Sequence, residues 1–200
     1  LLVISGDLTR DDADAATCRW MKSKLPPAIP AVVIPGNHDS AQVLYEVFAD
    51  SFNPTPDFCF ALNFDDTDVL FTNSGSGVFP TTQLDWLGQR RTRENAIMFT
   101  HYPTKKLSDG FMDRTYPLLN IDEADAAIRA TRISHVFCGH FHTDYDVLDG
   151  YHLHVTPSPA FTLDLHATEP ALTRPFTPVQ QIEIADGQVT AHVHYLDSRT

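Results

Sequence analysis

Two histidines, His140 and His142, stand one residue apart directly after an apolar run and a glycine, in the segment "VFCGHFHTDY" at residues 136–145. Side chains two residues apart in an extended chain point to the same side. Both imidazoles can therefore face one point in space, as ligands of a metal ion do. The alternative is a pair of histidines on the solvated face of a strand, and the pair by itself favours that alternative.

Three other polar clusters also follow short apolar runs, and they shift the balance towards a metal site. They are Gly6-Asp7, Gly36-Asn37-His38-Asp39 and His101. Ligands of open parallel sheets bind beyond the carboxyl ends of the strands. We therefore expect the four clusters to converge on one edge of a sheet.

The converging side chains would supply one carboxylate, one carboxamide and several imidazoles. This mixture of oxygen and nitrogen ligands favours Mn, Fe, Zn or Co over Ca or Mg. Asp7 could bridge two cations through its two oxygens, and Asn37 could add a ligand without adding charge. Two neighbouring cations can hold a bridging hydroxide and clamp a phosphoryl group for attack.

The elements that position these side chains alternate along the chain. Apolar runs predict strands at 1–4, 31–34, 58–62, 68–73, 96–103 and 135–142, and helices are predicted at 11–24, 41–51, 82–91 and 121–131. Three helix starts carry capping patterns: Asp39 or Ser40, Thr82 with Asp85, and Asn120 with Glu123. The alternation predicts an α/β core with parallel strands, followed by two antiparallel hairpins with Asp-Gly turns at 149–150 and 186–187.

Composition narrows the possible classes of function. The chain has 200 residues, and we expect one domain that spans residues 1–200. A net charge of -12 argues against a nucleic-acid partner, and no apolar run is long enough to cross a bilayer. Three scattered cysteines, Cys18, Cys59 and Cys138, form no disulfide framework and favour a reducing compartment, so a cytoplasmic location is expected.

The four clusters, read as "GDLT", "GNHD", "THYP" and "GHFH" in this order, resemble the calcineurin-like metallophosphoesterase superfamily. The resemblance is closest to its small cyclic-nucleotide phosphodiesterase-like branch, and it extends to "TPSPAF" and to the last hairpin. The Ser/Thr protein phosphatases, which carry GDxVDRG and GNHE, are less similar. The resemblance implies an α/β (α+β) fold, a metallophosphoesterase-type αββα sandwich, here without its first β-strand.

The resemblance also implies a role for each motif residue. Asp7 would bridge two divalent or trivalent ions, with Mn, Fe or Zn favoured. The second ion would be completed by Asn37, His101 and His140, and the first would bind His142. His38 would contact the phosphate and stabilise or protonate the departing oxygen, while Asp39 would orient His38.

One block of the family pattern, the D-x-H that supplies two further ligands to the first ion, does not precede the "GDLT" motif. Truncation is the expected account, so we expect this chain to bind about one ion firmly. A circular permutation that uses Asp164-Leu165-His166 instead is the alternative.

The function expected from these observations is metal-dependent hydrolysis of a small phosphodiester, such as a cyclic nucleotide, by a metal-bridging hydroxide. A phosphomonoesterase, a nucleotide pyrophosphatase and a non-catalytic metal-binding domain are the alternatives. The remaining histidine pairs, His152 with His154 and His192 with His194, are expected on solvated strand faces, because neither pair follows a glycine at a strand end. Cys138 is expected in the core, and Tyr102 and Phe141 either line the substrate pocket or pack.

Overall fold

The computed structural model describes residues 1–10, 14–51, 55–64, 67–173 and 177–196, and its central element is a six-stranded mixed sheet. The strands are β1 (Leu2–Ile4), β2 (Ala31–Val33), β3 (Phe60–Asn63), β4 (Asp68–Phe71), β5 (Ala96–Phe99), β6 (Ile133–Cys138), β7 (Tyr145–Asp149), β8 (Tyr151–Val155), β9 (Thr177–Ala185) and β10 (Gln188–Leu196). The helices are α1 (Ala15–Lys24), α2 (Ala41–Phe48), α3 (Thr81–Gln89), α4 (Phe111–Thr115) and α5 (Ile121–Arg129).

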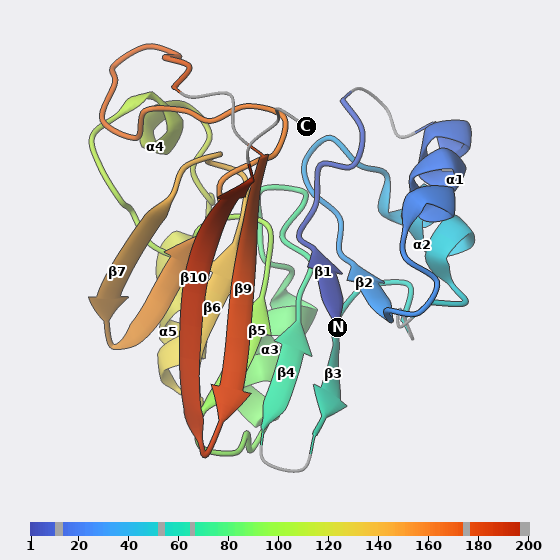
Figure 1. Cartoon of the computed structure of the whole chain (residues 1–200). Helices are drawn as coiled ribbons and strands as arrows, with labels where there is room; N and C mark the ends of the chain where they lie inside the picture. Colours follow the sequence, from blue (N-terminus) through green and yellow to red (C-terminus); the bar gives the residue numbers. More distant parts are fainter. Residues whose placement is uncertain (11–13, 52–54, 65–66, 174–176, 197–200) are drawn as a thin grey trace.

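The central sheet has the strand order β3-β4-β5-β6-β8-β7. Its four inner strands pair in parallel, and the edge strands β3 and β7 pair antiparallel to their neighbours. Two smaller ladders, the parallel pair β1-β2 and the antiparallel hairpin β9-β10, lie in front of one face of this sheet (Figure 1). Both hairpins with Asp-Gly turns are therefore confirmed.

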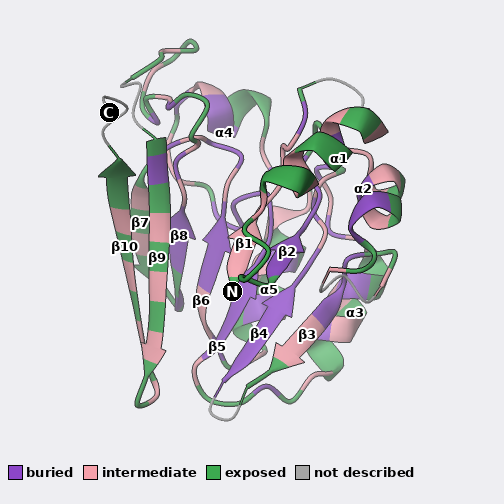
Figure 2. Ribbon diagram, turned by 45° about the vertical axis from the view of Figure 1, so that its right-hand side comes forward, coloured by how far each residue is buried: buried purple, intermediate pink, exposed green. Residues whose placement is uncertain are grey.

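Three hydrophobic clusters hold the layers together. Between the central sheet and the smaller ladders, the rings of Phe60, Phe71, Phe99 and Phe137 stack across neighbouring strands with centroid distances of 4.9, 5.4 and 5.2 Å. A second cluster packs α3 and α5 on the other face of the sheet, and a third packs α1 and α2 against β2 (Figure 2). The expected αββα sandwich is confirmed, and its strand ends carry the site.

Several expected boundaries of the helices were wrong. The first helix begins at Ala15 with Asp14 as its cap, and residues 11–13 lie outside the described residues. The second begins as expected, with Ser40 as its cap, but ends at Phe48. The third begins at Thr81, directly after Pro80, so Thr82 lies inside its first turn and does not cap it. Pro80 itself stands at the N-cap, and its carbonyl accepts hydrogen bonds from the backbone N–H groups of Gln83 and Leu84.

The fourth expected helix starts at the expected residue, but its capping box is wrong. Asn120 stands at the N-cap without a side-chain capping bond. Its amide instead accepts a hydrogen bond from the backbone N–H of Phe79 and donates one to the Phe79 carbonyl. These two hydrogen bonds hold the loop before α3 against the start of α5. The short helix α4 was not expected, because five residues are too few for a periodic apolar pattern.

The expectation for the two remaining histidine pairs is half right. His192 and His194 on β10 are exposed, as expected. His154 is buried, however, because β8 is an inner strand between β6 and β7, and its ring stacks on Phe137 at a centroid distance of 4.6 Å. Cys138 is fully buried, as expected. No helix within the described ranges is long and apolar enough to cross a membrane.

Candidate metal centre

The expected convergence of strand ends is present. Ligand atoms of Asp7, His101 and His140 all lie within 4.8 Å of one another. These residues follow β1, β5 and β6 directly, and Asn37 follows β2 and joins them, with its Oδ1 3.1 Å from His101 Nε2. Four of the expected site residues therefore meet, but they come from strand ends of two packed sheets, the β1-β2 ladder and the central sheet, and not from one edge of a single sheet.

His140 and His142 reach this edge by a different route from the one expected. Strand β6 ends at Cys138, so the two histidines are not part of an extended chain. Their φ angles are +63° and +52°, and Asp7 has a φ of +56°. Left-handed backbone is unfavourable for such residues and is concentrated at functional sites. The tight turn after the strand, and not strand alternation, therefore aims these side chains.

If His101 is neutral, it has no hydrogen to donate to two of the oxygen atoms that its ring faces. Its Nδ1 lies 2.7 Å from the carbonyl oxygen of Ser5, an acceptor, so the ring proton of a neutral His101 must sit on Nδ1. Its Nε2 then carries a lone pair, which faces Asn37 Oδ1 at 3.1 Å and Asp7 Oδ2 at 3.4 Å. Three acceptors in contact repel one another unless a proton or a metal cation lies among them.

His140 also has one ring nitrogen without a hydrogen, and it belongs to the same group of candidate ligands. Its Nε2 lies 3.0 Å from the Tyr116 carbonyl oxygen, which requires Nε2 to donate and leaves Nδ1 with a lone pair. Among the described residues, that buried Nδ1 has no hydrogen-bond partner, and the same is true of His142 Nδ1. Burial, followed by the charge of His101, lowers the pKa of His140 to about 3, so the imidazole is neutral and able to bind a metal.

Asp7 is held in its charged form. Burial raises its pKa, but when a proton on His101 Nε2 takes the place of a cation, the hydrogen bond and charge of that ring, and then the backbone N–H of His38, outweigh burial and lower the pKa to about 2. The His38 N–H donates to Asp7 Oδ1 over 3.0 Å. An ionised carboxylate, a carboxamide and neutral imidazoles form a donor set that fits a divalent transition ion.

Two glycines make this close approach possible. A Cβ on Gly36 would lie 2.2 Å from Asp7 Oδ1, and a Cβ on Gly6 would lie 2.5 Å from His101 Nδ1. Gly6 also has a φ of +103°. Any side chain at either position would displace a candidate ligand.

Asp39 ties the two loops of the site together through the backbone. Its carboxylate accepts hydrogen bonds from the backbone N–H groups of Gly36, Leu8 and Thr9 and from the Thr9 hydroxyl, at 3.0 to 3.3 Å. The bonds described for its carboxylate therefore anchor the loop that carries His38, and none of them reaches the His38 imidazole. The backbone N–H of His38 contacts Asp7 Oδ1, which places this residue at the edge of the centre.

We expect Asp39→Ala to lower the free energy of unfolding by about 1.5 to 3 kcal/mol, because a carboxylate that accepts backbone hydrogen bonds is lost. Asp57→Ala is the matched control. Asp57 is exposed and its carboxylate accepts one long bond, from Cys59 N at 3.4 Å. Denaturant unfolding of the two variants measures the difference. Equal destabilisation by both substitutions would contradict the anchoring role of Asp39.

The other residues named from the sequence take clear positions. Tyr102 and Phe141 are buried and pack against the His140 ring, with centroid distances of 3.8 and 5.4 Å. Packing is thus the better interpretation of both. Asp164 and His166 are exposed, and Asp164 Oδ1 accepts a hydrogen bond from the backbone N–H of His166.

Sequence reasoning missed three contributors to the site. The carbonyls of Ser5 and Tyr116 fix the tautomers of His101 and His140, and Phe161 lies against His142 with a centroid distance of 4.3 Å. Phe161 lies in the "TPSPAF" segment, which could have indicated it. Backbone carbonyls leave no signal in a sequence, since every residue has one.

Comparison with known proteins gives three findings. The family model described as calcineurin-like phosphoesterase matches residues 1–144. A relative in Fibrobacter succinogenes, named "Probable cyclic nucleotide phosphodiesterase", is 30% identical over 174 residues, which cover 84% of this chain and 68% of the relative. The 3',5'-cyclic adenosine monophosphate phosphodiesterase CpdA of Escherichia coli K12 is 25% identical over 98% of this chain and 74% of its own length.

Among solved structures, a dimetal phosphatase from Danio rerio is similar with a TM-score of 0.47 and 14% identity. The similar region covers 64% of this chain and 60% of that protein's chain.

Proposed function

The chain belongs to the calcineurin-like phosphoesterase family, and from this premise we propose that it hydrolyses a small phosphodiester, such as a 3',5'-cyclic nucleotide, at the centre formed by Asp7, Asn37, His101 and His140. The observation that carries the proposal is the contact of three acceptors, His101 Nε2, Asn37 Oδ1 and Asp7 Oδ2. Such a contact is favourable when a cation lies among the three atoms.

The described residues offer more candidate ligands to one ion than to a second. Asp7, Asn37, His101 and His140 would hold one ion, while Asp7 and His142 would contribute to a second. Metal affinity depends on the number and preorganisation of ligands, so the first ion would bind more firmly. When bound, such ions activate water and neutralise charge on a phosphoryl group.

The remaining side chains act on the substrate and on its departing group. His38 is exposed at the edge of the centre, and its backbone is fixed through Asp7 and Thr9. We assign it to the phosphate, where it would donate a proton to the departing oxygen. Asp39 would act as a positioning residue, because it anchors the loop of His38. Mn, Fe or Zn fits the donor set.

A comparison of two substrates tests the proposal. We expect kcat/KM for 3',5'-cyclic AMP to exceed that for p-nitrophenyl phosphate, a phosphomonoester, by at least about tenfold with Mn²⁺ present. One tenfold step corresponds to about 1.4 kcal/mol of differential transition-state binding. A preference for the monoester would support a phosphomonoesterase instead. Metal binding without hydrolysis of either substrate would contradict an enzymatic role for this chain.

A further inference from the structure

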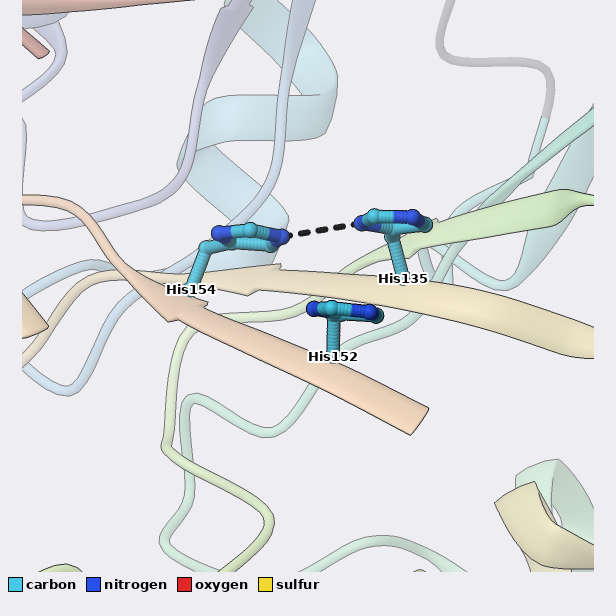
Figure 3. Close-up of side chains that lie close together, drawn as sticks. All are labelled: His135, His152 and His154. Carbon is cyan, nitrogen blue, oxygen red and sulfur yellow. Dashed lines mark hydrogen bonds between the residues drawn. The ribbon is translucent and has the colours of Figure 1, made fainter. Parts of the chain in front are cut away.

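A second cluster of imidazoles lies away from the candidate metal centre, on the face of the central sheet that carries Phe137. Strand β6 contributes His135, and the neighbouring strand β8 contributes His152 and His154 (Figure 3). Their ligand atoms all lie within 4.8 Å of one another. His135 lies within β6, whereas His140 lies in the turn beyond the end of this strand at Cys138, and the two clusters share no residue.

Strand register explains why the cluster forms. His135 on β6 is directly opposite His152 on β8, and His154 is directly opposite Phe137 on one side and Asp146 of β7 on the other. Residues directly opposite on paired strands point to the same face. Three neighbouring strands thus deliver three imidazoles and a carboxylate to one place.

The rings are held nearly parallel, as Figure 3 shows. The interplanar angle is 8° between His135 and His152 and 3° between His135 and His154, with centroid distances of 4.6 and 5.2 Å. Phe137 stacks on His154 and limits its movement. His152 is exposed and is the one imidazole of the three with room to adjust.

Asp146 fixes the tautomer of His154. Its Oδ1 lies 2.7 Å from His154 Nδ1, so Nδ1 donates and Nε2 is left with a lone pair. That Nε2 lies 2.9 Å from His135 Nδ1, which donates to it. A carboxylate that orients an imidazole, with the opposite nitrogen free to accept, is the arrangement found behind metal-binding histidines.

The geometry points to a second metal site, in which His135, His152 and His154 bind a zinc ion and Asp146 supports His154 from behind. Zinc bound by three imidazoles, with Zn–N bonds of about 2.0–2.1 Å, requires nitrogen atoms about 3.3 Å apart. The closest pair of nitrogens is 2.9 Å apart and the whole group lies within 4.8 Å, so the spacing fits once the rings of His135 and His152 turn out of their parallel stack and their in-plane lone pairs meet at the ion. A fourth position would remain for water.

Zinc entry would change one tautomer and release no proton. The hydrogen bond between His135 and His154 would break, two metal–nitrogen bonds would replace it, and the His135 proton would move from Nδ1 to Nε2. Burial, followed by the neighbouring His154 and His152, lowers the pKa of His135 to about 4, so the ring is neutral at physiological pH. A neutral imidazole binds zinc without first losing a proton.

Zinc binding to the full chain, measured by equilibrium dialysis, tests this site. We expect His152→Ala to bind one zinc ion fewer than the unchanged chain. Asp146→Asn should bind that ion about 10- to 100-fold more weakly, because the oriented carboxylate is lost while its size is kept. The double variant His192→Ala/His194→Ala is the matched control, since it removes the exposed histidine pair of β10, and it should bind zinc as the unchanged chain does.

The dialysis results distinguish a metal site from a packed histidine network, in which the three histidines stack and form hydrogen bonds without binding an ion. A packed network predicts the same zinc content and affinity in all four proteins, and that result would overturn the proposal. Zinc at the candidate metal centre contributes equally to every protein in the series, so it does not affect the difference. Because His152 and the Asp146 side chain are exposed, both variants should fold, and thermal unfolding in the presence of a chelator checks this.

Discussion

Replacing Asp7 by alanine is expected to lower kcat/KM for the phosphodiester by about 1000-fold or more, and to remove the bound metal with it. Asp7 is the one carboxylate in the described candidate centre, and it contacts His101 through Oδ2 and the His38 backbone through Oδ1. Its loss would remove both the negative charge that attracts the cation and the contact that fixes the His38 loop. Removal of electrostatic stabilisation on this scale typically costs a factor of 100 to 1000 for each group.

Two further variants make this result interpretable. Asp7→Asn keeps the shape of the side chain and an oxygen to accept the His38 N–H, so it should fold but bind the metal more weakly. Asp109→Ala removes an exposed aspartate that pairs with Lys106, and it should leave both metal and turnover unchanged. If Asp7→Asn and Asp7→Ala both hydrolysed the substrate at the original rate, Asp7 would have no role in the reaction.

Replacing His38 by alanine is expected to lower kcat by about 100- to 10000-fold, which is the usual contribution of a proton donor, while metal content stays unchanged. The prediction follows from two observations: the His38 backbone N–H contacts Asp7 Oδ1, and His38 is not among the close ligand atoms of Asp7, His101 and His140. The measurement is kcat at saturating metal, with metal content determined on the same sample.

A matched histidine variant controls for the His38 result. His166→Ala removes an exposed histidine that belongs to the downstream D-x-H of the sequence, and it should leave kcat unchanged. If His166→Ala lost metal and turnover, the downstream D-x-H would complete the centre. If His38→Ala lost its metal in proportion to its turnover, His38 would be a ligand and not a proton donor.

The position of the site could be predicted from the sequence because two kinds of local signal agree. Apolar runs identify the inner strands, and polar residues beside glycine mark their ends. Parallel pairing brings Asp7 and Asn37 together at the end of the β1-β2 ladder, and His101 and His140 together at the end of β5 and β6, but the packing of the two sheets on each other is what joins these pairs. Gly6 and Gly36 then leave the space that the close contacts need.

The details of the site could not be predicted in the same way. Spacing by two residues suggested that His140 and His142 share the face of a strand, but β6 ends at Cys138 and a left-handed turn aims them instead. A turn of this kind depends on the contacts around it as well as on the local residues. The Ser5 and Tyr116 carbonyls that set the histidine tautomers depend on tertiary packing in the same way.

The buried His154 shows a further limit of sequence reasoning. His152 and His154 were expected on a solvated strand face, but whether that face meets solvent depends on which strands become the neighbours of β8. The pairing of β8 between β6 and β7 places His154 opposite Phe137 and Asp146, which are 17 and 8 residues away in the chain. Cross-strand register of this kind cannot be derived from the residues of one strand.

The most direct test of the centre is to measure bound Mn²⁺ and phosphodiester turnover on the same samples of the unchanged chain, Asp7→Ala and His38→Ala. Mn²⁺ is the suitable probe because imidazole clusters without carboxylate ligands bind it weakly. We expect about one tightly bound ion in the unchanged chain, loss of both metal and turnover in Asp7→Ala, and loss of turnover alone in His38→Ala. Retention of both Mn²⁺ and turnover in Asp7→Ala would contradict a catalytic metal centre at these strand ends.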